Sequence, residues 1–124
     1  CFAFAAFTNA SLEPGIQIIL EETHLEKYIK NADLVITGEG RLDAQTAMGK
    51  APAGVAQLAK KHGKRVIAFA GCVTDDATVC NEYGIDAFFP ILRNIITLRE
   101  AMNTETAYKN LVDTACQVFR LIKI

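Results

Sequence analysis

The chain has 124 residues, of which 51% are hydrophobic and 22% are charged, and its formal net charge at neutral pH is −1. A chain of this length and apolar content can bury a core, so we expect a single domain over residues 1–124. A nucleic-acid-binding domain usually carries a basic excess, and this charge balance argues against such a partner.

The first seven residues, CFAFAAF, form an apolar run that begins at Cys1. Seven residues are too few to cross a bilayer, and the run has neither the basic flank nor the cleavage site of a signal peptide, so no membrane partner is expected. We interpret it as the end of a buried helix whose earlier part is missing, which makes the chain a piece of something longer. The four cysteines (Cys1, Cys72, Cys80 and Cys116) form no C-x-x-C pair. This favours reduced, mostly buried thiols in a cytoplasmic protein.

Two short helices are predicted next. A proline–glycine pair at residues 14–15 precedes a stretch whose isoleucine and leucine side chains share one helical face. The segment Thr23–Glu26 then has the Thr-x-x-Glu spacing of a reciprocal cap, so a second helix through Ile29 is expected.

Three short apolar runs predict buried strands. They lie near residues 33–37 (DLVIT), 66–70 (VIAFA) and 87–90 (AFFP). Runs that are apolar throughout are typical of parallel strands covered on both faces. Pro90 has no N–H to donate, so it fits only the end or the edge of its strand.

Helical segments separate and follow these strands. Pro52 suits the first turn of a helix that Gly63 ends, and His62 is expected to be a helix-end residue rather than a catalyst. A shorter helix is expected near residues 77–84. Over residues 108–122 apolar side chains recur at spacings of three and four, which is typical of a helix packed on a core. The alternation predicts an α/β fold, a three-layer sandwich with a mostly parallel, Rossmann-like or flavodoxin-like sheet.

In such sheets ligands bind at the carboxyl ends of the strands. The loops expected there cover residues 37–50, 72–76 and 92–96, and the first, TGEGRLDAQTAMGK, is the longest and most polar. It is not a P-loop, because Ala44 takes the place of the first glycine and Ala51 that of the metal-binding hydroxyl. It does not fit the dinucleotide fingerprint either, because Asp43 stands where the third glycine belongs.

The charged residues of this loop can nevertheless handle phosphate. Arg41 can hold a phosphate as a bidentate fork and Lys50 as a point charge. Glu39 and Asp43 can accept a proton, or share a Mg²⁺ ion that is bound through one or two carboxylates and the substrate phosphates. The aspartates at positions 75 and 76, in the next loop, are expected to have a capping or turn role more than a metal role.

The uncharged residues of the loop add recognition groups. Gln45 and Thr46 can hydrogen-bond a small polyhydroxyl substrate, while Gly38, Gly40 and Gly49 permit close backbone approach and offer N–H donors to an anion. The alternative is a solvated loop in which the charges pair with one another and bind nothing.

The segment DLVITGEGRLDAQTAMGKAPAGVAQLAKKHGKRVIAFAG resembles the signature region of the bacterial glycerate kinases that are built from two α/β domains. The segments LEPGIQIIL and TLREAM also resemble that family. Family members are much longer and have an N-terminal portion that is not present here, so the resemblance is to their C-terminal portion. The residues of the family's motif are matched here by Gly38, Glu39, Gly40, Arg41, Asp43, Gln45, Thr46, Gly49, Lys50 and Pro52.

The resemblance implies transfer of the terminal phosphoryl group of ATP to a hydroxyl of D-glycerate, with ATP and Mg²⁺ as cofactors and the remainder of the kinase chain as a partner. Arg41 and Lys50 would then hold phosphate or the glycerate carboxylate. Asp43 would be the base or the magnesium-linked carboxylate, with Glu39 in reserve, and the glutamine and threonine at 45 and 46 would orient the substrate. An isolated fragment is expected to be inactive and to associate with itself. The alternative is a non-catalytic α/β module that binds an anion or a partner.

Overall fold

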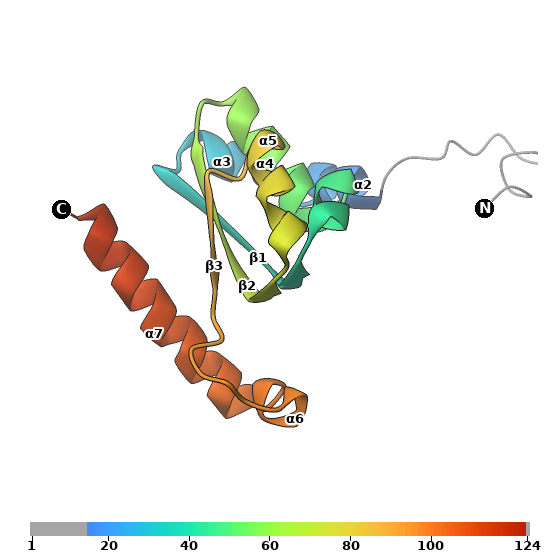
Figure 1. Ribbon diagram of the computed structural model, residues 1–124. Helices are drawn as coiled ribbons and strands as arrows, with labels where there is room; N and C mark the ends of the chain where they lie inside the picture. The colour runs from blue at the N-terminus through green and yellow to red at the C-terminus, as the bar shows by residue number, and fades with distance from the viewer. Residues whose placement is uncertain (1–14, 124) are drawn as a thin grey trace, which may run out of the picture.

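The computed structural model describes residues 15–123 and is built on a parallel sheet with strand order β1–β2–β3 (Figure 1). The strands are β1 (Leu34–Leu42), β2 (Arg65–Val73) and β3 (Ala87–Pro90), and both neighbouring pairs are parallel. The three predicted strands are confirmed, with Pro90 at the end of the shortest. The apolar run CFAFAAF and the proline at position 14 lie outside the described residues.

Helices connect and cover the strands in the order that the alternation predicts. They are α2 (Gly15–Glu22), α3 (Leu25–Lys30), the 3-10 helix η1 (Ala44–Met48), α4 (Ala51–Lys61), the 3-10 helix η2 (Asp75–Thr78), α5 (Val79–Glu82), α6 (Leu98–Ala101) and α7 (Thr104–Ile122). No helix within residues 15–123 is long and apolar enough to cross a membrane.

The sheet separates two layers of helices, which confirms the three-layer α/β fold. Figure 1 shows α2 to α5 on one side of the strands and α7 on the other. Ala56 and Ala59 of α4 are fully buried in the core that contains Val66, and their small side chains let the helix approach the sheet closely. On the opposite face Val118 of α7 packs with Phe69 in a second, smaller core.

The reciprocal cap predicted at Thr23 and Glu26 is wrong. The Thr23 hydroxyl donates to the Ile19 carbonyl at 2.7 Å, so this threonine completes the end of α2 instead of starting α3. The chain enters α3 through His24, whose backbone lies in the left-handed region with φ of 51° and whose side chain makes no capping hydrogen bond. A spacing of residue types cannot distinguish these two uses of a threonine, because a hydroxyl can donate backward to a helix as well as accept at a helix start.

The helix-end role of His62 is confirmed. It is the C-cap of α4, and its Nε2 atom lies 2.8 Å from Glu26 Oε1, which ties α4 to α3. The three described cysteines are free thiols, but their expected burial holds only in part, because Cys80 is buried, Cys72 is half-buried and Cys116 is exposed.

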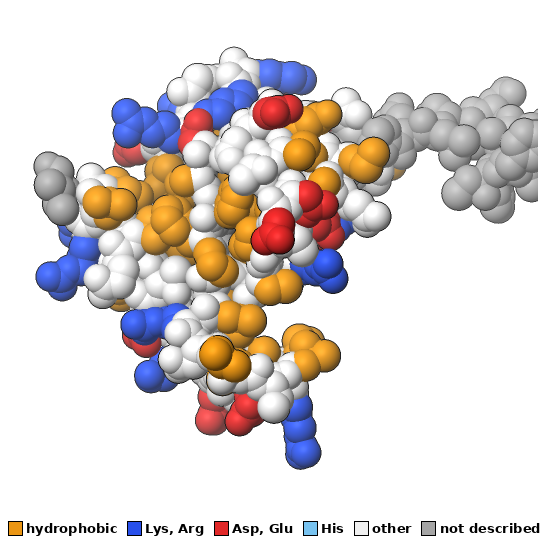
Figure 2. All heavy atoms as spheres, viewed as in Figure 1, with side chains coloured by type: hydrophobic (Ala, Val, Ile, Leu, Met, Phe, Trp, Pro, Cys, Tyr) orange, Lys and Arg blue, Asp and Glu red, His pale blue; other side chains and the backbone are white. Residues whose placement is uncertain are grey.

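The apolar stripe of α7 is covered only in part. Val118 is buried, whereas Tyr108 remains 70% exposed. Figure 2 shows hydrophobic side chains over α6 and between β3 and α7. The exposed large apolar residues of this part of the chain are Leu92, Ile95, Leu98, Met102, Tyr108, Leu111, Val112, Phe119, Leu121 and Ile122, and we call them the α6–α7 apolar surface.

Candidate active site

The first six residues of the loop predicted at residues 37–50 are strand. Residues 37–42 belong to β1 and pair with β2 as far as Leu42 opposite Val73. The pairing depends on glycine, because a Cβ atom on Gly71 would overlap the carbonyl oxygen of Gly40, and one on Gly38 would lie 2.9 Å from the Phe69 carbonyl oxygen. The glycines at 38 and 71 are therefore required by the close approach of two strands.

Asp43 forms the junction between β1 and η1. It is the N-cap of η1, with Oδ1 accepting from the Thr46 N–H at 3.0 Å, while the Asp43 N–H donates to Thr46 Oγ1 at 3.2 Å. This reciprocal cap is the motif that the sequence suggested at another place in the chain. Thr46 is fully buried, so its hydroxyl faces protein groups and not solvent.

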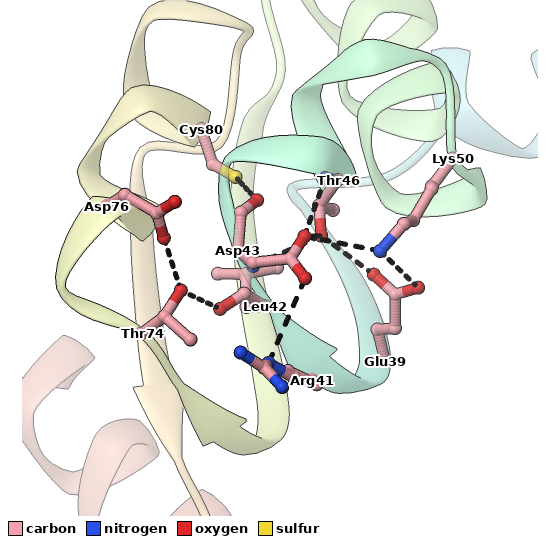
Figure 3. A network of polar contacts seen from close by, with 9 residues as sticks. All are labelled: Glu39, Arg41, Leu42, Asp43, Thr46, Lys50, Thr74, Asp76 and Cys80. Carbon is pink, nitrogen blue, oxygen red and sulfur yellow. Dashed lines mark hydrogen bonds and ion pairs between the residues drawn. The ribbon is translucent and has the colours of Figure 1, made fainter.

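Lys50 links the two carboxylates of the site (Figure 3). Its Nζ atom lies 3.2 Å from Asp43 Oδ1 and 3.8 Å from Glu39 Oε1. Thr46 Oγ1 lies 3.0 Å from Glu39 Oε2 and 3.1 Å from Asp43 Oδ1, and it can give its single proton to one of them at a time. Gly49, with φ of 102°, makes the turn that places Lys50 at the N-cap of α4. Three elements, β1, η1 and α4, therefore bring one cation and two anions together.

The other predicted residues lie around this network. Arg41 is 66% exposed, and its Nε atom lies 3.9 Å from Asp43 Oδ2, a distance that allows attraction but no hydrogen bond. Gln45, in η1, is exposed, as are Gly40 and Gly49 on either side of it. The structure therefore gathers Glu39, Arg41, Asp43, Thr46 and Lys50 and leaves the glutamine at the surface beside them.

The electrostatics of the network keep Asp43 ionised. Desolvation opposes the charged form, but the hydrogen bonds from Lys50 and Thr46 outweigh it, and the pKa of the Asp43 carboxyl group is lowered from its ordinary value. A carboxylate with a lowered pKa is a weak proton acceptor at neutral pH, whereas it is well suited to hold a cation.

Each carboxylate keeps one oxygen whose contact with a cation is too long for a hydrogen bond. Asp43 Oδ2 faces Arg41 at 3.9 Å, and Glu39 Oε1 faces Lys50 at 3.8 Å. These oxygens fit Mg²⁺, which proteins commonly bind through one or two carboxylates while substrate phosphates and water complete the coordination. Within residues 15–123 no group of three or more His, Cys, Asp or Glu side chains could hold a metal ion without such help.

Two neighbours of Asp43 were missed by the reading of the sequence. Thr74, directly after β2, lies with its hydroxyl 3.1 Å from the Leu42 carbonyl oxygen, and the buried Cys80 donates its thiol to the Asp43 carbonyl oxygen at 3.4 Å. The position of Thr74 in the sequence could have identified it, because it follows a predicted strand and therefore lies at the same edge of the sheet as Asp43. Asp76 accepts from the Thr74 hydroxyl at 2.5 Å, a local contact in the first turn of η2.

Glu39 also borders a groove of about 300 Å³ between the sheet and α7. Its lining is mostly apolar and includes Ile36, Phe69 and Leu111. A larger cavity of about 860 Å³ lies between α2, α3 and α4, and none of the candidate site residues lines it. The groove is therefore the hollow that adjoins the polar network.

The structure is that of a parallel α/β domain with a network of carboxylates and cations at the carboxyl end of a strand, the place where such sheets bind ligands. Comparison with known proteins makes the class specific. The Glycerate kinase family matches residues 1–123, and the chain belongs to this family.

Individual relatives agree with this assignment. Glycerate kinase of Haemophilus influenzae is 47% identical over 92% of this chain, and Glycerate 2-kinase of Escherichia coli is 45% identical over 97% of it. The crystal structure of a putative glycerate kinase 2 from Salmonella typhimurium covers 98% of the chain with a TM-score of 0.66 at 38% identity. The chain spans about 30% of the length of the first two relatives and 31% of the third.

Proposed function

We propose that the chain is the C-terminal part of a glycerate kinase, which transfers the terminal phosphoryl group of ATP to a hydroxyl of D-glycerate. The observation that carries the proposal is the position of Lys50 between Asp43 and Glu39 at the carboxyl end of β1. Phosphoryl transfer asks an enzyme mainly to position its substrates and to neutralise charge, and this network supplies both signs of charge. The name of the E. coli relative leads us to assign the 2-hydroxyl as the acceptor.

The geometry supports a role for each charged residue. Lys50 and the exposed Arg41 hold phosphate or the glycerate carboxylate, Lys50 as a point charge and Arg41 as a bidentate fork. Asp43 and Glu39 would hold Mg²⁺ through Asp43 Oδ2 and Glu39 Oε1, the oxygens whose contacts with Arg41 and Lys50 are too long for hydrogen bonds. The lowered pKa of Asp43 favours this role over that of a general base. Magnesium, when bound, neutralises charge that develops on the transferred phosphoryl group.

The uncharged residues divide between substrate contact and support. Gln45 and the backbone at Gly49 and Gly40 are exposed and are assigned to substrate binding. Gly38 lines the 300 Å³ groove and contributes backbone there. Thr46 is fully buried, so we assign it to the support of Asp43 and Glu39 instead of to direct contact with glycerate.

The remainder of the kinase chain is the proposed partner of the α6–α7 apolar surface. Ile95, Leu98 and Met102 are each more than three-quarters exposed, an arrangement that marks an interaction surface when such residues gather. A cytoplasmic location is part of the same proposal, since ATP and glycerate are metabolites of that compartment. The fragment alone is expected to associate through this surface.

A second candidate is a non-catalytic α/β module. It is favoured by one observation, namely that the charges of the site already pair with one another, Lys50 with Asp43 and Glu39, and Arg41 with Asp43. Such pairs at a partly exposed site contribute little to stability, so they do not by themselves explain why the residues lie together.

Steady-state kinetics of the complete enzyme decide between these candidates. Asp43→Asn keeps the shape and the capping acceptor but removes the charge, and we expect kcat to fall by about 10²–10⁴-fold while KM for ATP changes far less. Added Mg²⁺ restores part of the rate if Asp43 holds the metal and none if it is the base. Asp113→Asn on α7, where Asp113 pairs with Arg93, is the matched control and keeps its rate.

Lys50→Met is expected to behave differently from Asp43→Asn. A cation that holds phosphate acts in both the ground state and the transition state, so its loss raises KM for ATP or glycerate as well as lowering kcat. Lys109→Met, at an exposed pair on α7, is the control. Phosphorus NMR of the product identifies the phosphorylated hydroxyl. Near-normal kinetics in both Asp43→Asn and Lys50→Met would remove this network from the active site and leave the non-catalytic module.

A further inference from the structure

The backbone on both sides of Asp43 is held by the segment that follows β2. β3 ends at Pro90, opposite Ala70, whereas β1 and β2 continue to pair through Leu42 and Val73. Within the described part of the chain β1 is an edge strand that pairs with β2, so the end of β1 is held by β2 and by the residues that follow it. The position of Asp43 depends on what those residues contact.

Thr74 makes the first of these contacts. Its backbone N–H donates to the Leu42 carbonyl at 3.0 Å and continues the ladder by one residue. Its hydroxyl lies 3.1 Å from the same carbonyl oxygen and 2.5 Å from Asp76 Oδ1. The hydroxyl has a single proton, and the shorter contact gives it to Asp76. The Leu42 carbonyl is therefore held by the Thr74 N–H, and the Thr74 side chain ties this residue to the first turn of η2, as Figure 3 shows.

Cys80 makes the second contact, on the other side of Asp43. Its thiol donates to the Asp43 carbonyl oxygen at 3.4 Å, and the side chain is almost fully buried in the main core. The carbonyl groups before and after the Asp43 Cα atom are thus both bonded to residues of the segment 74–80.

We propose that Thr74 is a positioning residue for the reaction. Its hydroxyl, bonded to Asp76, holds in place the backbone N–H that bonds the Leu42 carbonyl, and together with the Cys80 thiol on the Asp43 carbonyl it orients the Asp43 carboxylate. The inference rests on the proposed function, because it assigns Asp43 to the chemistry. Neither residue contacts the reacting groups in this assignment. Groups that hold a reacting side chain in place affect rate steeply, since a misplacement of about 1 Å can cost about 10²-fold.

The test uses the complete enzyme and compares Thr74→Val with Thr74→Ser. Valine keeps the branched shape and removes the hydroxyl, and we expect kcat to fall by about 10-fold or more with KM for ATP within about 2-fold. Serine keeps the hydroxyl and is expected to retain most of the rate. Thr78→Val, at an exposed threonine of the same segment whose side chain caps nothing, is the matched control and keeps its kcat.

A double-mutant comparison separates positioning from general damage. If Thr74 acts through Asp43, adding Thr74→Val to Asp43→Asn lowers kcat no further, because residues that act as a unit are not additive. A purely structural role lowers both backgrounds by the same factor and overturns the inference. Cys80→Ala removes the second contact and provides an independent variant if Thr74→Val fails to fold, and it is expected to lower kcat in the same way.

The outcomes distinguish the two proposals. Asp43→Asn with near-normal kcat refutes the proposed role of Asp43 itself. Asp43→Asn with greatly lowered kcat, together with normal kcat in folded Thr74→Val and in Cys80→Ala, refutes only the positioning role. The positioning role is supported if kcat falls in Thr74→Val and in Cys80→Ala and is retained in Thr74→Ser. It is also supported if Thr74→Val has no added effect in the Asp43→Asn background.

Discussion

The buried hydroxyl of Thr46 predicts the order of stability of variants at this position, and that order tests the description of the site. The side chain is fully buried, donates toward the Glu39 carboxylate at 3.0 Å and accepts from the Asp43 N–H at 3.2 Å. In Thr46→Val the bond to a charged group is lost, which costs about 1.5–3 kcal/mol, and the neutral bond costs about 0.5–1.5 kcal/mol. The additional buried methyl group returns about 0.8 kcal/mol. We therefore expect Thr46→Val to destabilise the protein by about 1–4 kcal/mol.

Thr46→Ser is the matched variant. It keeps the hydroxyl and loses one buried methyl group, at a cost of about 1 kcal/mol. The predicted order of stability is therefore threonine, then serine, then valine. Urea unfolding of the complete protein and both variants, followed by circular dichroism, measures the order from the transition midpoints. If the hydroxyl made no useful bonds, valine would fill the site at least as well as threonine and would be more stable than serine. That reversed order would refute the reasoning.

The remaining predictions concern strand pairing, pH and the isolated chain. Gly71→Ala is expected to cost about 1–3 kcal/mol of stability, because the new Cβ meets the backbone of Gly40, whereas Gly40→Ala meets nothing within 4 Å and should melt near the wild type. At Asp86 burial opposes ionisation, but hydrogen bonds from Lys60 and the Val66 N–H lower its pKa. The stabilisation from ionised Asp86 is therefore complete above the unfolded pKa of about 3.9 and is lost as pH falls through the folded pKa. Acid unfolding of Asp86→Asn should lack this pH-dependent loss of stability. The 124-residue chain alone should sediment as an oligomer without kinase activity, and turnover by the monomeric chain would contradict this.

The elements of the fold were predictable because their signals are local. Continuous apolar runs marked the three strands, and Pro52 and Gly63 marked the two ends of α4. The candidate site was predictable as a set of residues, since Glu39, Asp43 and Lys50 stand close together in one polar segment. None of these predictions required knowledge of what lies beside the segment in space.

What the sequence by itself determined is the α/β alternation, the family resemblance and the group of charged residues at the end of the first strand. Only the tertiary structure decided that residues 37–42 are strand, because a ladder to β2 depends on partners about 30 residues away along the chain. It also decided that Thr46 is buried and that Thr74 and Cys80 hold the backbone around Asp43. Periodicity and spacing describe neighbours along the chain, whereas a hydroxyl or thiol is assigned its partner by packing between elements that are distant in sequence.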